Sequence, residues 1–438
     1  MTKKNIFVMA MDDFHQVMLE RLLGSEDMVF HPLLDRETAV DTIDYDMAEL
    51  LDRARQTLED FPGTVDAVVG YWDFPTSSLL PILRREWNLP GPSLEATLRC
   101  GHKYWARTEE AQVAPRQTPR FAIVNPFDEN VLDKPPLPYP FWIKPVRAHS
   151  SQLGFHVDNR RDFEHALEQT RDGIHVFAKP FNYILSMAQL PDDIASVDGW
   201  HCIAEEIVSA GQQCTLEGYV LNGWIESTGI VDSIRYENGI SFFRYEYPSS
   251  LPYKIQERMI RITEKILSSI GFDNSAFNIE FYWDRGRDKI WLLEINTRVS
   301  ESHSDIFEKV DGASNQAVTV DVALGRDPEF PYQRGEFPRA AKFFWRVFKN
   351  GVVKAVPTEE EISRVEREIP GTVIRPQVSP GIRLDELLEQ DSYSYAICYL
   401  FIGGEDQKDL LDKYIRCQEM LTFEIEPIET GEPRENKE

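Results

Sequence analysis

The sequence has little of what marks several large classes of protein. Its five cysteines are scattered and form no CxxC or CxxxC pair, so neither a zinc site nor a disulfide framework is indicated, and buried free thiols in a reducing compartment are expected. No apolar run approaches the length of a membrane span, and Asp12 and Asp13 cut short the first apolar run, so a signal peptide is not indicated. We therefore expect a soluble, cytoplasmic protein with no membrane partner.

Basic residues are scarce relative to acidic ones. The chain has 47 Lys and Arg against 73 Asp and Glu, and its formal net charge is −26. Binding to DNA or RNA requires a basic surface, so nucleic acid is excluded as a partner. A polyanionic ligand would need cations supplied locally by its own site. The first predicted strand is not followed by GxGxxG, so the dinucleotide-binding fingerprint is also absent.

The order of the predicted elements indicates several domains. Strands are predicted at 5–11 and 66–73 and helices at 46–60 and 76–87, an alternation typical of an open parallel sheet. An α/β domain is therefore expected first, followed by mixed α+β and strand-rich parts. The expected divisions are an α/β domain at 1–98, a central domain at 99–330 with a lid lobe at about 140–222, a strand-rich domain at 335–425, and a disordered tail at 426–438.

Residues 277–298 form the most informative stretch. Two apolar runs flank the charged turn DRGRD, which predicts a β-hairpin. Glu280 lies in the first run; Glu294 and Asn296 lie two positions apart in the second, so they share one face of a strand, and Arg298 extends that face if the strand persists. Such oxygen donors suit Mg²⁺. A single acid in a strand is more often simply exposed to water, so this interpretation depends on the rest of the chain.

Upstream lysines supply candidate cations. Lys103 and Arg107 lie one turn apart on a predicted helix, a spacing that a solvated helix face would normally explain. Lys144 lies inside the apolar strand FWIKPV, which is costly unless the ammonium meets an anion. The polar loop 148–154 could cradle phosphates with its backbone N–H groups. The segment 180–200 is expected to be irregular, and 297–312 to be a polar loop.

Six motifs now stand in a fixed order: HKYWAR (102–107), WIKPV (142–146), the polar loop 148–154, AEEIV (204–208), FNIE (277–280) and LLEINTR (292–298). In this combination the chain resembles the ATP-grasp superfamily over roughly residues 1–325. The C-terminal unit resembles the extra domain of the carboxylate–amine ligases, including the L-amino-acid ligases. The resemblance implies an ATP-grasp fold with ATP and Mg²⁺ as cofactors, Mn²⁺ being possible.

The same resemblance implies roles for individual residues. ATP would be held by two lysines, the polar loop and an inter-lobe hinge, whose adenine contacts correspond to Glu205 and the backbone near Val208. The implied ATP contacts are Lys103, Lys144, Ser150, Ser151, Glu205, Glu206, Val208 and Gln213. The implied Mg²⁺ ligands are Glu280, Glu294 and Asn296, and the implied catalytic residues are Arg298 and Lys144.

The resemblance further implies an ATP-dependent ligase that activates a carboxylate as an acyl phosphate and couples it to an amine, with an amino acid as the expected substrate and a homodimer as a possible assembly. Asp73 follows a strand end, where ligands of open α/β sheets bind, although a helix N-cap would also explain it. The candidate substrate contacts are Asp73, Glu217, Arg244, Ser300, Glu301 and His303.

Two alternatives remain. Biotin-dependent carboxylases of the family have a Glu–His pair after the arginine. Here His303 matches the histidine, but Glu301 is one residue out of step and Ser302 occupies the place of the acid. The second alternative is an ATP-binding protein without catalytic activity.

Overall fold

The computed structural model describes residues 3–22, 24–42, 45–148, 152–208, 211–387, 390–391 and 393–428. The chain forms two compact units. The first contains Met1–Asp232, Ser249–Ser304 and Ala313–Pro331; the second contains Ser233–Pro248, Asp305–Gly312 and Tyr332–Glu438. The second unit thus takes two short segments from the middle of the chain.

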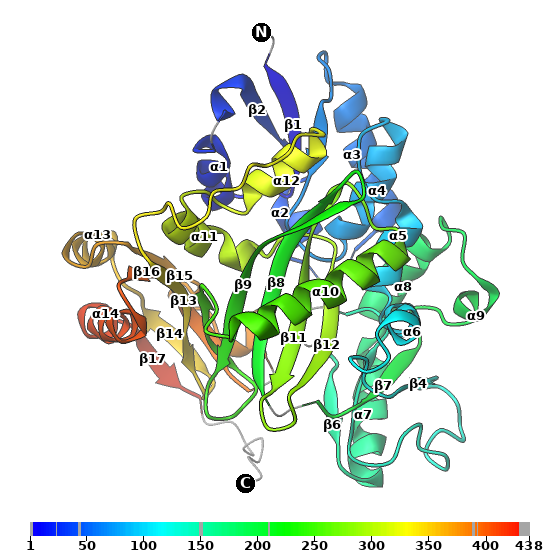
Figure 1. Ribbon diagram of the computed structural model, residues 1–438. Coiled ribbons are helices and arrows are strands. Elements are labelled where there is room, and N and C mark those ends of the chain that lie inside the picture. The colour runs from blue at the N-terminus through cyan, green and yellow to red at the C-terminus, as the bar shows by residue number, and fades with distance from the viewer. Residues whose placement is uncertain are drawn as a thin grey trace. The chain divides into compact units, whose positions relative to one another are not determined.

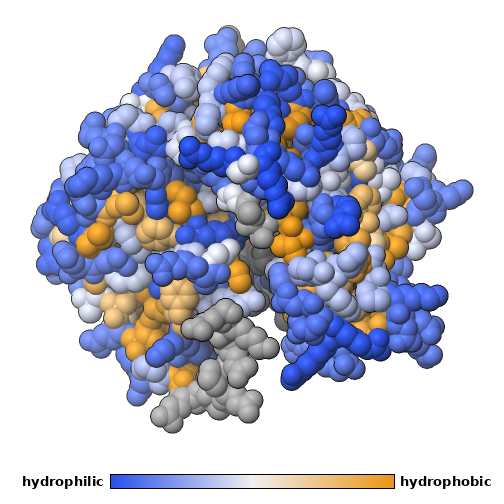
Figure 2. Space-filling view, turned by 60° about the horizontal axis from the view of Figure 1, so that its bottom comes forward, coloured by the Kyte–Doolittle hydropathy of each residue, from blue (hydrophilic) through white to orange (hydrophobic). Residues whose placement is uncertain are grey.

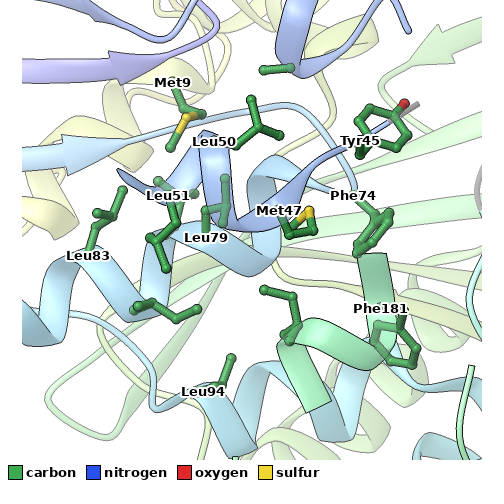
Figure 3. Packing of buried hydrophobic residues seen from close by; sticks show 14 of the residues in the cluster. Met9, Tyr45, Met47, Leu50, Leu51, Phe74, Leu79, Leu83, Leu94 and Phe181 are labelled. Carbon is green, nitrogen blue, oxygen red and sulfur yellow. The ribbon is translucent and has the colours of Figure 1, made fainter. Parts of the chain in front are cut away.

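A three-stranded parallel sheet opens the first unit, in the order β2-β1-β3. Apolar side chains of α3 and α4 pack against this sheet around Met9, as Figure 3 shows. Phe74, just after β3, packs edge-on against Phe181 with 6.0 Å between ring centroids. The predicted parallel α/β arrangement is confirmed. Its elements are β1 (Lys4–Met9), α1 (Asp13–Glu20), η1 (Ser25–Asp27), β2 (Met28–Leu33), α2 (Arg36–Ala39), α3 (Met47–Glu59), β3 (Ala67–Val69) and α4 (Thr76–Glu86).

A four-stranded antiparallel sheet follows, in the order β4-β7-β5-β6. The expectation of an irregular segment at 180–200 was wrong in part, because α8 continues to Leu185 and α9 occupies Asp192–Ala195. Pro180 interrupts the helical pattern in the sequence, yet Phe177, Phe181 and Ile184 bury one face of α8 and hold the helix in place. The elements are β4 (Phe121–Val124), β5 (Phe141–Pro145), β6 (Phe155–Val157), α7 (Arg160–Gly173), α8 (His175–Leu185), α9 (Asp192–Ala195) and β7 (Cys202–Glu206).

The predicted hairpin is confirmed as β11 (Ser275–Asp284) and β12 (Lys289–Asn296), at the edge of strands ordered β12-β11-β8-β9. The helix α10 (Tyr253–Ile270) lies across one face of these strands (Figure 1), burying Met259 and Ile266 against them. The polar face of the hairpin is therefore backed by an apolar layer. The other elements around it are α5 (Leu94–Gly101), α6 (Lys103–Val113), β8 (Gln212–Leu221), β9 (Trp224–Arg235) and α12 (Gln316–Ala323).

The second unit contains strands in the order β10-β13-β16-β15 and a small pair, β14-β17. The expected polar loop at 297–312 was wrong in its second half, since η2 and α11 form there. Ile306, Phe307 and Val310 are buried at helical spacing, which explains the helix. The elements are β10 (Phe242–Tyr247), η2 (Glu301–His303), α11 (Ser304–Asp311), β13 (Arg339–Val347), β14 (Gly351–Ala355), α13 (Glu359–Glu368), β15 (Thr372–Pro376), η3 (Leu384–Glu386), β16 (Tyr395–Gly404), α14 (Gln407–Met420) and β17 (Glu424–Pro427), with η2 and Ser304 assigned to the first unit.

The surface agrees with the composition. Figure 2 shows a face dominated by hydrophilic residues with small apolar areas between them, as expected for a net charge of −26. Across the described residues, no helix combines the length and apolar character needed to cross a membrane. All five cysteines are free and buried. Of the expected disordered tail, residues 426 and 427 belong to β17 and 429–438 lie outside the described residues.

Candidate active site

The polar face of the hairpin is formed by residues directly opposite one another on β11 and β12. Glu280 pairs with Glu294, and Asn278 pairs with Asn296, so each pair has neighbouring side chains. The Glu280 carboxylate accepts a hydrogen bond of 3.0 Å from the side-chain amide of Gln213, and Asn296 Nδ2 donates to Asn278 Oδ1 at 2.9 Å. The hairpin therefore brings together the three residues predicted to hold a metal ion.

Lys103 reaches this face from the first residue of α6. Its Nζ lies 2.9 Å from Glu294 Oε1 and donates to the carbonyl oxygen of Ala148 at 2.8 Å. Only 8% of Lys103 is exposed, and this burial lowers its pKa although Glu294 opposes the effect. Burial alone would raise the pKa of Glu294, but Lys103 and Lys144 outweigh it and lower that pKa. The lysine is thus a buried partner of the hairpin and not part of a solvated helix face.

A second charge network surrounds Arg107, one turn along the same helix. Its guanidinium pairs with Glu205 Oε1 and with Glu110 Oε2, each at 2.5 Å, and donates to the carbonyl oxygen of Leu293 at 2.6 Å. Lys144 Nζ lies 2.7 Å from the other oxygen of Glu205. Two carboxylates and two cations thus join α6, β5, β7 and β12.

The pKa values of the two acids diverge in this network. Burial opposes ionisation of Glu205, but Arg107 and Lys144 outweigh it and lower its pKa to about 2. For Glu110 burial prevails over the attraction of Arg107 and raises the pKa to about 7. Glu205 therefore stays ionised and can hold the Lys144 ammonium in position.

A third cluster lies at the end of the N-terminal sheet, on Asp73. Arg298 Nη2 lies 2.7 Å from Asp73 Oδ2, and Arg147 Nη2 lies 2.7 Å from Asp73 Oδ1. Sequence analysis singled out Asp73 and Arg298 separately but missed Arg147. The available signal was an arginine ending the apolar run that contains Lys144, where its charge would need a partner.

Three predicted substrate contacts meet in a closed network beside β8. Glu217 is fully buried; its carboxylate accepts hydrogen bonds from the backbone N–H of Ser300 at 3.1 Å and the side-chain amide of Asn315 at 2.8 Å. His303 Nδ1 lies 2.6 Å from the same carboxylate. This network anchors the segment after β12 to β8. The neighbouring Glu301 is more open and accepts a hydrogen bond of 2.6 Å from the Ser302 hydroxyl.

The remaining predicted residues lie elsewhere. Arg244 belongs to the second unit, where its Nε lies 2.9 Å from Glu246. Glu206 pairs with Arg120 at 2.8 Å. Val208 follows β7 and is half-buried. Ser150 and Ser151 lie outside the described residues.

The hairpin can supply part of a coordination shell. Among the residues that the structure describes, no three His, Cys, Asp or Glu side chains gather as a metal-binding group. Glu280, Glu294 and Asn296 offer two carboxylates and one amide oxygen. Mg²⁺ is typically held by one or two carboxylates and completes its shell with phosphate and water oxygens, so these donors fit Mg²⁺ bound together with a nucleotide.

Residues 137–304 match the family model of the ATP-grasp domain. An L-amino acid ligase from Bacillus licheniformis has a similar structure, with a TM-score of 0.70 and 16% identity over 97% of this chain and 99% of that one. Phosphoribosylglycinamide synthetase from Anaerococcus prevotii has a TM-score of 0.64 and 15% identity over 97% of this chain and 100% of that one. A third similar structure is the biotin carboxylase domain of 2-oxoglutarate carboxylase from Hydrogenobacter thermophilus, in complex with MgADP, ADP and bicarbonate. Its TM-score is 0.61, with 12% identity over 98% of this chain and 91% of that one. A search of curated proteins found no match to this chain.

An ATP-grasp fold therefore extends over nearly the whole length of the chain, and residues 137–304 match the model of the ATP-grasp domain. Its structural neighbours include ligases that differ in substrate, and the family uses ATP and Mg²⁺. Nothing in the comparisons supports Mn²⁺.

Proposed function

We propose that this protein is an ADP-forming ligase that activates a carboxylate as an acyl phosphate and joins it to an amine, an amino acid being the expected substrate. One observation carries the proposal: Glu280 and Glu294 face each other across the hairpin, with Lys103 already paired to Glu294. Two adjacent carboxylates with a buried lysine suit a divalent cation and a polyphosphate together. The structural neighbours that are ligases support the same reading.

Each cluster would have its own task. Lys103 and Lys144 would bind the phosphates of ATP, and the segment from Glu205 to Val208 would contact the adenine. Glu280, Glu294 and Asn296 would hold Mg²⁺, which neutralises phosphate charge when bound. Arg298 would stabilise the phosphoryl group during its transfer, because a guanidinium can offer two parallel N–H donors to an oxyanion.

The proposed reaction has two steps. An oxygen of the substrate carboxylate attacks the γ-phosphorus, the bond to the β-phosphate oxygen breaks, and ADP leaves. The nitrogen of the amine then attacks the acyl carbon, the bond to the phosphate oxygen breaks, and the amide forms with loss of phosphate and a proton. Positioning and charge neutralisation supply most of the catalysis in the first step.

The proposal can be tested by a screen for ADP and phosphate release over paired amino acids and small carboxylic acids. The variant Glu294→Gln should lower turnover at least about 100-fold, as expected for loss of charge stabilisation at a phosphoryl-transfer site, while Glu164→Gln, an exposed position on α7, should leave turnover unchanged. Unchanged turnover in Glu294→Gln would reject the metal site.

The same screen separates the alternatives. Turnover that requires bicarbonate and biotin would indicate a carboxylase, and ATP binding with no turnover on any pair would indicate a binding protein. His303 lies against the buried Glu217, an arrangement that does not favour the carboxylase.

A further inference from the structure

Arg147 lies in the cluster on Asp73, and the proposed reaction gives it no role. It lies just after β5, and its Nη1 donates to the carbonyl oxygen of Gly101 at 3.0 Å while its guanidinium lies over the ring of Phe74, 5.1 Å from the centroid. Its side chain is 7% exposed. Two separate parts of the chain, Gly101 and the neighbours Asp73 and Phe74, thus hold this guanidinium at the end of the N-terminal sheet, where ligands of open α/β sheets bind.

In direct ion pairs, the cluster on Asp73 has two guanidiniums for one carboxylate. Asp73 is the shared carboxylate partner of two guanidiniums, those of Arg147 and Arg298. Glu301 and Glu294 also attract Arg298, after Asp73 in strength. By contrast, Lys103 has its own direct partner in Glu294. A buried cation without its own counterion is unfavourable, so an anion from outside the chain would complete the cluster.

The unsatisfied hydrogen-bond donors of the two arginines also indicate an anion from outside the chain. Within the described residues, the Nε atoms of both Arg147 and Arg298 are buried and have no acceptor. Buried donors are nearly always satisfied, and two such donors beside one carboxylate are therefore unusual. Asp73 is 26% exposed and Arg298 17%, so a small ligand can approach the cluster from that side.

We propose that Arg147 and Arg298 together form an anion site for the substrate carboxylate and for the acyl phosphate made from it, with Asp73 keeping the two guanidiniums side by side before the substrate arrives. The proposal rests on the proposed ligase function and adds Arg147 to the residues that contact substrate. Two guanidiniums can bind both oxygens of a carboxylate, which a single arginine shared with Asp73 cannot do as well.

Acetylphosphonate, a stable analogue of an acyl phosphate, can probe this site in the full-length protein loaded with ADP and Mg²⁺. By calorimetry, Arg147→Gln should raise its dissociation constant about 10-fold or more, the expected loss for a charge-assisted hydrogen bond. Arg147→Lys keeps the charge but not the planar fork, so its loss should be smaller. Arg160→Gln, an exposed arginine of the same lobe that pairs with Asp133, should bind as the wild type does.

The affinity for ADP is measured in the same variants, and it should change less than the affinity for acetylphosphonate, because Lys103 and Lys144 have their own ion pairs with Glu294 and Glu205 and Arg147 acts on Lys103 only through its charge. Normal ADP binding with unchanged acetylphosphonate binding in Arg147→Gln would overturn the anion site and leave the ligase proposal standing. Absence of ADP binding in the wild type would instead overturn the proposed function. If Arg147→Gln does not fold, Arg147→Lys decides: a dissociation constant equal to that of the wild type rejects the proposal.

Discussion

At the scale of single residues, Arg107 neutralises two buried carboxylates next to the proposed phosphate site. It pairs with Glu205 and Glu110 and donates to the backbone of β12, while Glu205 also holds Lys144. A buried carboxylate between two cations is stabilising only while all partners remain charged. Protonation of Glu205 would therefore both release Lys144, a proposed phosphate ligand, and destabilise the fold.

This link predicts a pH dependence. The pKa of Glu205 is lowered from 4.5 to about 2, burial being outweighed by Arg107 and Lys144. A carboxyl with a lowered pKa in the folded state contributes stability that is present above its unfolded pKa and is lost as the pH falls through the folded one. The contribution is on the order of 3 kcal/mol, so the stability difference between wild type and Glu205→Gln should shrink from about pH 4.5 to pH 2.

Urea unfolding at a series of pH values measures this difference directly. Glu164→Gln serves as the control, because the exposed Glu164 should show a small and nearly constant difference. A wild-type advantage over Glu205→Gln that stays constant down to pH 2 would contradict the assignment.

At the scale of elements, the hairpin depends on the helix behind it. One face of α10 buries Met259 and Ile266 against β8 and β11, and the opposite face of the hairpin carries Glu280 and Glu294. The positions of the two carboxylates are thus set by apolar packing on the other side of the sheet, since a strand exposes alternate side chains on opposite faces.

Shortening a side chain in this layer should weaken the whole unit. Ile266→Ala should lower the free energy of unfolding by about 2–5 kcal/mol, because Ile266 is fully buried and a cavity would remain. Lys265→Ala, at the exposed neighbouring position, should stay within about 0.5 kcal/mol. Chemical denaturation compares the two, and equal effects would show that α10 does not support the hairpin as described.

At the scale of the whole molecule, a net charge of −26 opposes the approach of free ATP. The cations at the site and Mg²⁺ must offset this repulsion. MgATP at 100 times its dissociation constant should stabilise the folded chain by about 2.7 kcal/mol, seen as a rise in the melting temperature.

Removing Mg²⁺ should abolish most of the rise in melting temperature that MgATP produces. With EDTA, ATP alone should bind more weakly, and the loss should be larger at low than at high ionic strength because salt screens the repulsion. Thermal unfolding with ATP, with and without Mg²⁺, at two salt concentrations tests this. An equal rise with and without Mg²⁺ would contradict the metal site at Glu280, Glu294 and Asn296.

The sequence by itself determined the features that depend on neighbours along the chain. Alternation placed Glu294 and Asn296 on one face of a strand, and the turn DRGRD fixed the hairpin that brings Glu280 opposite Glu294. Helical periodicity predicted the helices at 46–60 and 76–87, which the structure has as α3 and α4. It failed at α8, where Pro180 disrupted the pattern but tertiary burial maintained the helix. These features are local because the backbone period decides which side chains share a face.

Only the tertiary structure decided which distant charges meet. Asp73 lies 74 positions from Arg147 and 225 from Arg298 along the chain, yet contacts both. Lys103 and Arg107 look like a solvated helix face in the sequence but are buried partners of Glu294 and Glu205. The periodicity of the sequence does not encode such pairings. A buried charge is stable only when it is paired, and its partner can come from any part of the chain that folding brings close.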